Sequence, residues 1–303
     1  MTATARWTAW SCEVNLVVAR ASSLPMARVF LEDLLDDVDR AVSRFRPDSD
    51  LARVNAAAGR LVAVSPLTMR LVDVALDAAR TTDGLTDPTV GAHVVAAGYD
   101  GDIADVRNRL APARVPAPRP ATWEDVRVDR DLRRLGVPAG VRLDLGATAK
   151  AWTADEAAVQ VARRLHTPVL VEIGGDVAVR TSADRPFTVA VSERAGEAAE
   201  LVAVHHGGVA TSSTTARRWH RADGPAHHVV DPRTGRPAQG AWRTVSVWAP
   251  TAVEANAAST AMICLDRSEG LAFLDDRGLP ARLVGQDGTV EHTRAWPQQS
   301  RAA

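Results

Sequence analysis

The stretch Val169-Leu170-Val171-Glu172-Ile173-Gly174-Gly175-Asp176-Val177-Ala178-Val179-Arg180 predicts two β-strands joined by a tight turn. Both flanks are rich in β-branched residues, and the Gly-Gly-Asp sequence between them is typical of a hairpin. We interpret this turn mainly as hairpin geometry, and a direct functional role is the alternative. Because helical and strand segments surround the hairpin without a strict strand–helix–strand rhythm, the sequence predicts an α+β fold.

Further elements are predicted on both sides of this hairpin. Apolar spacing and capping signals indicate helices at 26–42, 65–81, 152–165 and 252–265. Strands are expected at 13–18, 187–191 and 245–249, with a second hairpin over 282–291. No repeat or linker divides the chain. We therefore expect a single domain over residues 1–303, with a surface excursion at 101–130 and a disordered tail at 296–303.

Composition excludes several classes of protein. The chain has 303 residues, 46% of them hydrophobic and 24% charged, which is typical of a soluble globular protein. A net charge of −1 and the lack of a basic run argue against nucleic-acid binding. The two cysteines, Cys12 and Cys264, lie far apart and without metal-type neighbours, so a zinc site is not expected. We find no signal peptide and no apolar run of about 18 residues, and we expect a cytoplasmic protein without a membrane span.

Lys150 is the single lysine among 36 basic residues. It ends the segment Leu143-Asp144-Leu145-Gly146-Ala147-Thr148-Ala149-Lys150, where a helix is predicted to begin. A helix start offers free N–H groups to an anion, and a lysine adds a compact full charge. We interpret the segment as a phosphate site. The alternative is a structural ion pair between Lys150 and Asp144 or Asp155.

Two other segments have the composition of ligand-binding loops. The first, Thr82-Asp83-Gly84-Leu85-Thr86-Asp87-Pro88-Thr89-Val90-Gly91, holds more acids and threonines than a turn needs. In the second, Gly208-Val209-Ala210-Thr211-Ser212-Ser213-Thr214-Thr215, consecutive hydroxyls such as those of Thr211 and Ser212 suit phosphate or ribose. A helix stop and a plain polar loop are the respective alternatives.

Two further segments contain candidates for proton transfer and metal binding. In His227-His228-Val229-Val230-Asp231-Pro232-Arg233-Thr234-Gly235, His228 stands beside an acid and a turn, so it suits acid–base work or ligand contact. His227 is expected to be structural. Asn256 and Thr260 are four residues apart and share one helix face, and their oxygens suit Mg²⁺. The alternative is a small-residue helix packed closely against a neighbour.

Taken in order, these segments resemble the ApbE family, the FAD:protein FMN transferases. Matching elements extend from Ser43-Arg44-Phe45-Arg46-Pro47 to Thr260-Ala261. The most specific are Asp144-Leu145-Gly146-Ala147-Thr148-Ala149-Lys150, Ala210-Thr211-Ser212 and His228-Val229-Val230-Asp231-Pro232-Arg233-Thr234-Gly235. The resemblance implies a tunnelling-fold-like α+β domain with FAD in a cleft. It also implies Mg²⁺-dependent transfer of FMN from FAD to a threonine of an acceptor flavoprotein, with release of AMP.

The resemblance also implies roles for individual residues. FAD contacts are expected at Phe45, Leu85, Thr86, Asp87, Asp144 and Lys150, and His228 is expected near the phosphates. The metal would be held by the backbone carbonyl of Ala147 together with Asn256 and Thr260. Lys150 would stabilise the charge that develops during phosphoryl transfer, with His228 or Asp231 as the base.

Two positions depart from the family pattern. An asparagine, Asn256, stands where the family usually has an aspartate, so Mg²⁺ should bind less tightly unless FAD phosphates or another acid compensate. Trp10-Ser11-Cys12 replaces the usual Met-Gly-Thr, and Trp10 could stack on the isoalloxazine. Two alternative functions follow: an FAD-binding protein with little transferase activity, and an FAD pyrophosphatase that yields FMN and AMP.

Overall fold

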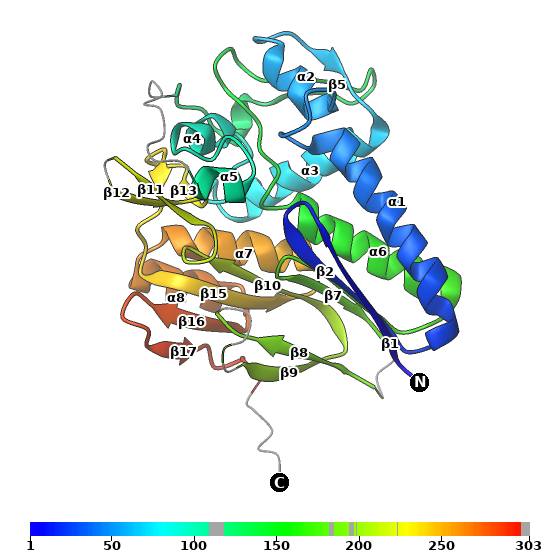
Figure 1. Cartoon of the computed structure of the whole chain (residues 1–303). Helices are drawn as coiled ribbons and strands as arrows, with labels where there is room; N and C mark the ends of the chain where they lie inside the picture. The colour runs from blue at the N-terminus through cyan, green and yellow to red at the C-terminus, as the bar shows by residue number, and fades with distance from the viewer. Residues whose placement is uncertain (109–117, 182–184, 194–196, 198, 223, 298–303) are drawn as a thin grey trace. The chain divides into compact units, whose positions relative to one another are not determined.

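The computed structural model describes residues 1–108, 118–181, 185–193, 197, 199–222 and 224–297. Contacts divide the chain into two compact units (Figure 1). The sheet unit comprises 1–33, 150–216 and 240–303, and the helical unit comprises 34–149 and 217–239. The single domain expected from the sequence stays a prediction.

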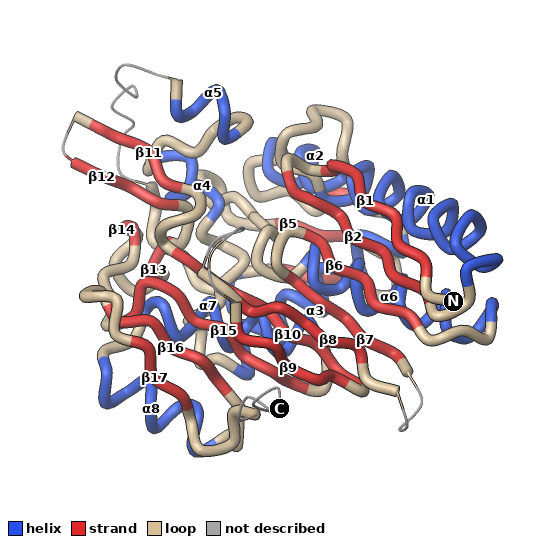
Figure 2. Tube along the Cα trace, turned by 60° about the horizontal axis from the view of Figure 1, so that its bottom comes forward, coloured by secondary structure: helices blue, strands red, loops and turns tan. Residues whose placement is uncertain are grey.

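The sheet unit is built on eight antiparallel strands (Figure 2). Their order across the sheet is β1 (Ala3–Ala9), β2 (Cys12–Val18), β6 (Val169–Ile173), β7 (Asp176–Arg180), β10 (His206–Ser213), β15 (Trp242–Ala249), β16 (Ala281–Gly285) and β17 (Val290–His292). The predicted strand at 13–18 is confirmed, because alternate residues of β2 are buried. The predicted hairpin is confirmed as β6 and β7, which are joined by Gly174 and Gly175 at φ 57° and 93°.

Helices and a hairpin that lies outside the eight-stranded sheet complete the sheet unit. Helix α6 (Ala149–Leu165) follows the predicted anion segment, and α7 (Ala252–Cys264) packs on β10 and β15 (Figure 1). A short helix, α8 (Arg267–Asp276), precedes β16. Valines of the hairpin formed by β8 (Phe187–Val191) and β9 (Glu200–Val204) pack with Val177, Val179 and Val209 of the sheet. Trp296 is 5% exposed and belongs to this cluster, so the prediction that a disordered tail starts at residue 296 is wrong for Trp296 itself. Residues 298–303 of that predicted tail lie outside the described residues.

The helical unit contains most of the remaining elements. Helix α1 (Leu24–Val42) runs from the sheet unit into it and is followed by α2 (Asp50–Ala56), α3 (Pro66–Thr81), α4 (Gly91–Ala96) and α5 (Ile103–Arg107). Three short sheets accompany them. They pair β3 (Val62–Ala63) and β4 (Arg127–Asp129) with β5 (Arg134–Gly136), β11 (Arg218–Arg221) with β12 (Gly224–His227), and β13 (Val230–Asp231) with β14 (Arg236–Pro237). Of the predicted excursion at 101–130, residues 109–117 lie outside the described chain, and the rest includes α5 and β4.

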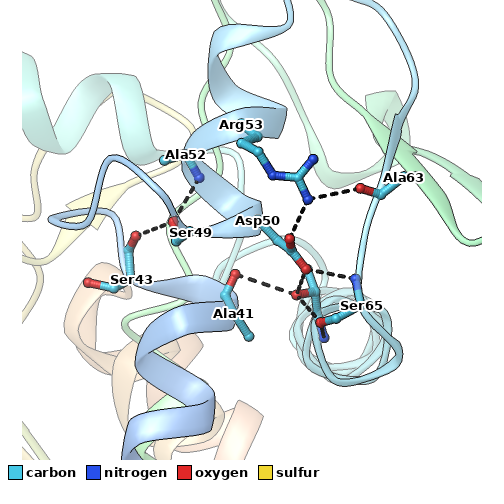
Figure 3. A network of polar contacts seen from close by, with 9 residues as sticks. Ala41, Ser43, Ser49, Asp50, Ala52, Arg53, Ala63 and Ser65 are labelled. Carbon is cyan, nitrogen blue, oxygen red and sulfur yellow. Dashed lines mark hydrogen bonds and ion pairs between the residues drawn. The ribbon is translucent and has the colours of Figure 1, made fainter.

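A polar network fixes the turn that follows α1 (Figure 3). The carboxylate of Asp50, at the start of α2, accepts hydrogen bonds from Ser65 N at 2.7 Å and Thr68 Oγ1 at 2.7 Å, both at the start of α3. Ser49 Oγ, the cap of α2, donates to Ser43 O at 2.6 Å. Ser65 also caps α3, as its Ser-Pro sequence predicts. Because Thr68 Oγ1 lies 3.4 Å from Ala41 O, the starts of both helices are held to the end of α1.

Among the described residues, no helix is long and apolar enough to cross a membrane. The cytoplasmic location expected from the sequence stays a prediction.

Candidate functional site

In the sheet unit, Lys150 lies in the first turn of α6 and forms an ion pair with Asp176. Lys150 Nζ lies 2.5 Å from Asp176 Oδ2, and the two side chains are 17% and 1% exposed. The structural alternative of a pair with Asp144 or Asp155 is therefore wrong about the partner. Asp176 belongs to the Gly-Gly-Asp turn, which we interpreted mainly as hairpin geometry.

Hydrogen bonds extend this pair into a buried polar chain. Asn256 Nδ2 donates to Asp176 Oδ1 at 2.5 Å, and Thr260 Oγ1 donates to Asn256 Oδ1 at 3.1 Å. The hydroxyl of Thr260 in turn lies 3.1 Å from that of Ser212 on β10. The structure thus brings four predicted residues together, Lys150, Asn256, Thr260 and Ser212. The fifth member is Asp176, for which a functional role was only the alternative interpretation.

Helix α7, which carries Asn256 and Thr260, is fixed at its N-terminus from two sides. Thr251 Oγ1 accepts from Glu254 N at 3.1 Å, which is an ordinary N-cap. Asp155 of α6 accepts from Val253 N at 3.1 Å, and burial raises the pKa of this carboxyl. The close packing expected of a small-residue helix is also present, since a Cβ on Gly208 would collide with Ala252.

Two other predicted ligand contacts in the sheet unit, Thr211 and Trp10, do not belong to the buried polar chain. Thr211 and Ser212 are neighbours on a strand, so their side chains face opposite sides of the sheet, and Thr211 Oγ1 instead lies 2.8 Å from Ser246 Oγ. Trp10 occupies the turn between β1 and β2 with φ 51°. That turn lies beside the β6–β7 turn, because Gly174 N donates to Glu13 O at 2.9 Å.

In the helical unit, four predicted residues line one small pocket. Thr86, Asp87, Asp144 and Ala147 share it with Ala75, Pro88 and Thr148. Leu85 is buried next to them in sequence, at 9% exposure.

The carboxylate of Asp87 is held firmly in this pocket. Its Oδ1 accepts from Thr89 N and Thr89 Oγ1, both at 2.7 Å, and its Oδ2 accepts from Trp123 N at 2.9 Å. Burial raises the pKa of Asp87 despite these hydrogen bonds. Buried acids with perturbed pKa values are concentrated at functional sites, so this geometry agrees with the predicted ligand contact without testing it.

Arg44 connects Asp144 to the exposed ring of Phe45. Its Nε lies 3.0 Å from Asp144 Oδ2, and its Nη1 donates to Tyr99 O at 2.7 Å. The guanidinium carbon lies 4.1 Å from the ring centre of Phe45 and 4.5 Å from that of Tyr99. Phe45 remains 51% exposed, so its ring is available to an aromatic ligand. Arg44 stands in the sequence motif Ser43-Arg44-Phe45-Arg46-Pro47, but no role was predicted for it.

The histidine segment also folds within the helical unit. Both oxygens of Asp231 accept hydrogen bonds from Arg233, which braces the turn and occupies this carboxylate. His227 Nε2 lies 3.0 Å from Ala238 O, and burial lowers its pKa, which fits the structural role expected for it. His228 lies between β12 and β13 and is partly buried. His93, which belongs to none of the sequence motifs, packs against the turn at Gly235, and burial lowers its pKa.

Comparison with known proteins shows similarity over most of the chain. The model of the ApbE family matches residues 8–283. A protein of Klebsiella pneumoniae named FAD:protein FMN transferase is 28% identical over 291 residues, which are 92% of this chain and 82% of the relative. One of the same name from Treponema pallidum is 29% identical, covering 92% and 83% of the two chains.

Solved structures share the fold. The crystal structure of the ApbE protein of Thermotoga maritima matches with a TM-score of 0.85 and 25% identity over 97% of each chain. The flavinyl transferase ApbE of Pseudomonas stutzeri, in its apo form, matches with a TM-score of 0.79 and 22% identity over 97% of this chain and 95% of that one. The predicted α+β class and the predicted resemblance are therefore confirmed.

Proposed function

Because this chain belongs to the ApbE family, we propose that it is an enzyme that transfers FMN from FAD to a threonine hydroxyl of an acceptor flavoprotein. In this proposal AMP is released and Mg²⁺ assists at the diphosphate. The names of the curated relatives support flavin transfer itself. The threonine acceptor, the release of AMP and the metal are our extension of that activity to this chain.

The observation that carries the proposal is the buried polar chain from Lys150 through Asp176 and Asn256 to Thr260. A lysine ammonium, a carboxylate, an amide oxygen and a hydroxyl are gathered here from α6, β7 and α7. Such groups bind and position a charged phosphoryl group, and phosphoryl transfer depends mainly on position and electrostatics.

The oxygen atoms of the buried polar chain are also of the chemical type that Mg²⁺ prefers as ligands. Among the described residues, no group of three or more His, Cys, Asp or Glu side chains is placed to hold a metal ion. Asn256 and Thr260 nevertheless present oxygen atoms, which Mg²⁺ prefers, and Asp176 supplies a carboxylate beside them. When bound, the ion would neutralise charge on the diphosphate. The carbonyl of Ala147, the third predicted donor, belongs to the helical unit, and its contribution stays a prediction.

The proposed reaction is a displacement at the FMN phosphorus. The acceptor threonine oxygen forms a bond to that phosphorus, the bond to the bridging diphosphate oxygen breaks, and AMP leaves with that oxygen. His228 takes the threonine proton. We favour His228 over Asp231 as the base because both carboxylate oxygens of Asp231 are occupied by Arg233. Phe45, Asp87 and Asp144 bind FAD in this proposal, and Lys150 stabilises the charge that develops.

One experiment distinguishes transfer from the alternatives. The protein is incubated with FAD, Mg²⁺ and a candidate acceptor flavoprotein, and AMP and acceptor-bound flavin are both measured. A matched acceptor in which valine replaces the threonine serves as the control. AMP together with threonine-dependent bound flavin supports the transferase. AMP without bound flavin indicates a pyrophosphatase, and neither product indicates an FAD-binding protein.

Substitution of Lys150 tests its part in this reaction. Lys150→Ala removes the ammonium, so we expect kcat for transfer to fall by about two orders of magnitude, as for other single electrostatic groups. Lys150→Arg keeps the charge but replaces a compact head with a broad fork, and we expect only partial recovery. Unfolding midpoints are measured alongside. Transfer by folded Lys150→Ala at the wild-type rate would contradict the role.

A further inference from the structure

Asp176 is the most deeply buried charged side chain in the polar chain. It begins β7, directly after the two glycines of the hairpin turn, and its side chain is 1% exposed. A buried carboxylate without a partner is strongly destabilising, so a residue in this place needs its charge and its oxygens satisfied. The hairpin turn would form without an acid at this position, because the two glycines supply its positive φ values.

Each oxygen of Asp176 has a different partner. Oδ2 accepts from the ammonium of Lys150, and Oδ1 accepts from the side-chain amide of Asn256, both at 2.5 Å. These partners lie 26 and 80 residues away in the chain, on two different helices. Asp176 therefore joins α6 to α7 through the two side chains that we place in the phosphoryl-transfer site.

The contact with Asp176 determines which way the Asn256 amide points. An amide has one donating and one accepting end, whereas an ionised carboxylate only accepts. Asp176 therefore requires the nitrogen of Asn256 to face it, and the oxygen is left to face Thr260, whose hydroxyl lies 3.1 Å away. The amide oxygen and the hydroxyl, both suited to Mg²⁺, are gathered on one side by this arrangement.

The same contact also holds Lys150 in place. An ammonium has three donors, and Asp176 accepts from one of them. A lysine side chain has many rotamers, and a short ion pair to a buried acid restricts them. The stem of Lys150 also passes close to the turn, since a Cβ on Gly174 would lie 3.9 Å from its Cδ.

We propose that Asp176 is a positioning residue, which fixes the Lys150 ammonium and turns the Asn256 oxygen toward the divalent cation. This inference rests on the proposed function and extends it to a residue outside the predicted set. Asp176 also places a negative charge next to the neutral Asn256. Because that charge is paired with the Lys150 ammonium, the carboxylate acts on cation binding mainly through the orientation of Asn256.

The test measures binding of Mn²⁺, a paramagnetic substitute for Mg²⁺, to the intact 303-residue chain in the presence of FAD by electron paramagnetic resonance. Asp176→Asn removes the charge and lets the Asn256 amide turn over. We expect its Kd for Mn²⁺ to rise at least about tenfold, which is 1.4 kcal/mol. The double variant Asp176→Asn/Asn256→Asp reverses the pair and returns a carboxylate, and we expect its Kd to recover to within about threefold of the wild type.

A matched control uses the same hairpin. Glu172 on β6 is a partly buried acid whose pKa is raised by burial, and its carboxylate accepts from Asn15 at 3.5 Å. Glu172→Gln should change the Kd for Mn²⁺ by less than about threefold, because Glu172 acts on Asp176 only through its charge and makes no hydrogen bond to it. Unfolding midpoints of all variants identify loss of fold, and a purely structural role would lower the midpoint without recovery of Mn²⁺ affinity in the double variant.

Three outcomes would overturn the inference. They are wild-type Mn²⁺ affinity in Asp176→Asn, an equal loss in the single and double variants, and no Mn²⁺ binding by the wild-type protein with FAD. A wild-type protein that binds FAD and Mn²⁺ but transfers no FMN would instead contradict the proposed function and leave the role of Asp176 intact.

Discussion

Arg44 is a single residue on which two predicted FAD contacts depend, because it touches both Asp144 and Phe45. Arg44→Lys keeps the charge but loses the fork that reaches Asp144 and Tyr99 O together, and it stacks less well between the rings. We expect KM for FAD to rise about tenfold while kcat changes less than about threefold, because ground-state binding is lost. Steady-state kinetics with varied FAD measures both constants.

The control for Arg44 lies in the same turn. Arg46 is also an arginine, but its ion pairs with Asp39 and Asp48 are partly exposed, and such pairs contribute little. Arg46→Lys should leave both kinetic constants near the wild-type values. If Arg44→Lys and Arg46→Lys raised KM for FAD equally, the effect would not depend on the contacts of Arg44, and its specific role in FAD binding would be wrong.

The polar chain shows what sequence could and could not predict about single residues. The solitary lysine and the spacing of Asn256 and Thr260 were visible in the sequence, and these residues do lie together. The partner of Lys150 was not visible, because the acids considered were those near it in sequence. Asp176 reaches Lys150 only when β7 and α6 pack, and no local pattern encodes that contact.

Helices and strands were predicted more accurately than their contacts, because their signals are local. The Ser65-Pro66 cap and the apolar spacing that follows it place α3, and the alternation in 13–18 places β2. The capping of α7 by Asp155 is different, since this acid lies 98 residues before the amide that it accepts. The sequence offers no signal for such a contact between two helices.

The cap supplied by Asp155 can be tested through the stability of α7. Asp155→Ala leaves Val253 N without its acceptor, and we expect the free energy of unfolding to fall by about 1–3 kcal/mol. Asp155→Asn keeps an acceptor and removes a buried charge whose pKa is raised by burial, so its loss should be smaller. Urea denaturation measures both. Greater destabilisation by Asn than by Ala would contradict the capping role.

The end of the described chain is tied to the sheet unit through Glu200 on β9, which makes the pH dependence of stability predictable. Arg282 Nε, His292 Nε2 and Trp296 Nε1 lie 2.7, 3.0 and 3.2 Å from its oxygens. Burial would raise the pKa of Glu200, but hydrogen bonds and charge from Arg282 and His292 outweigh it and lower the pKa.

A lowered carboxyl pKa gives stability that is present above the unfolded value of about 4.3 and is lost as the pH falls through the folded value. Glu200→Gln should therefore reduce the free energy of unfolding by about 1–3 kcal/mol at pH 7 and progressively less below pH ~4. Urea titrations from pH 3 to 7 measure this difference.

Glu291→Gln, at a more exposed pair with Arg267, is the control and should change stability by less than about 1 kcal/mol. A Glu200→Gln effect that does not shrink in acid would show that packing, rather than the ionised carboxylate, secures this end of the chain.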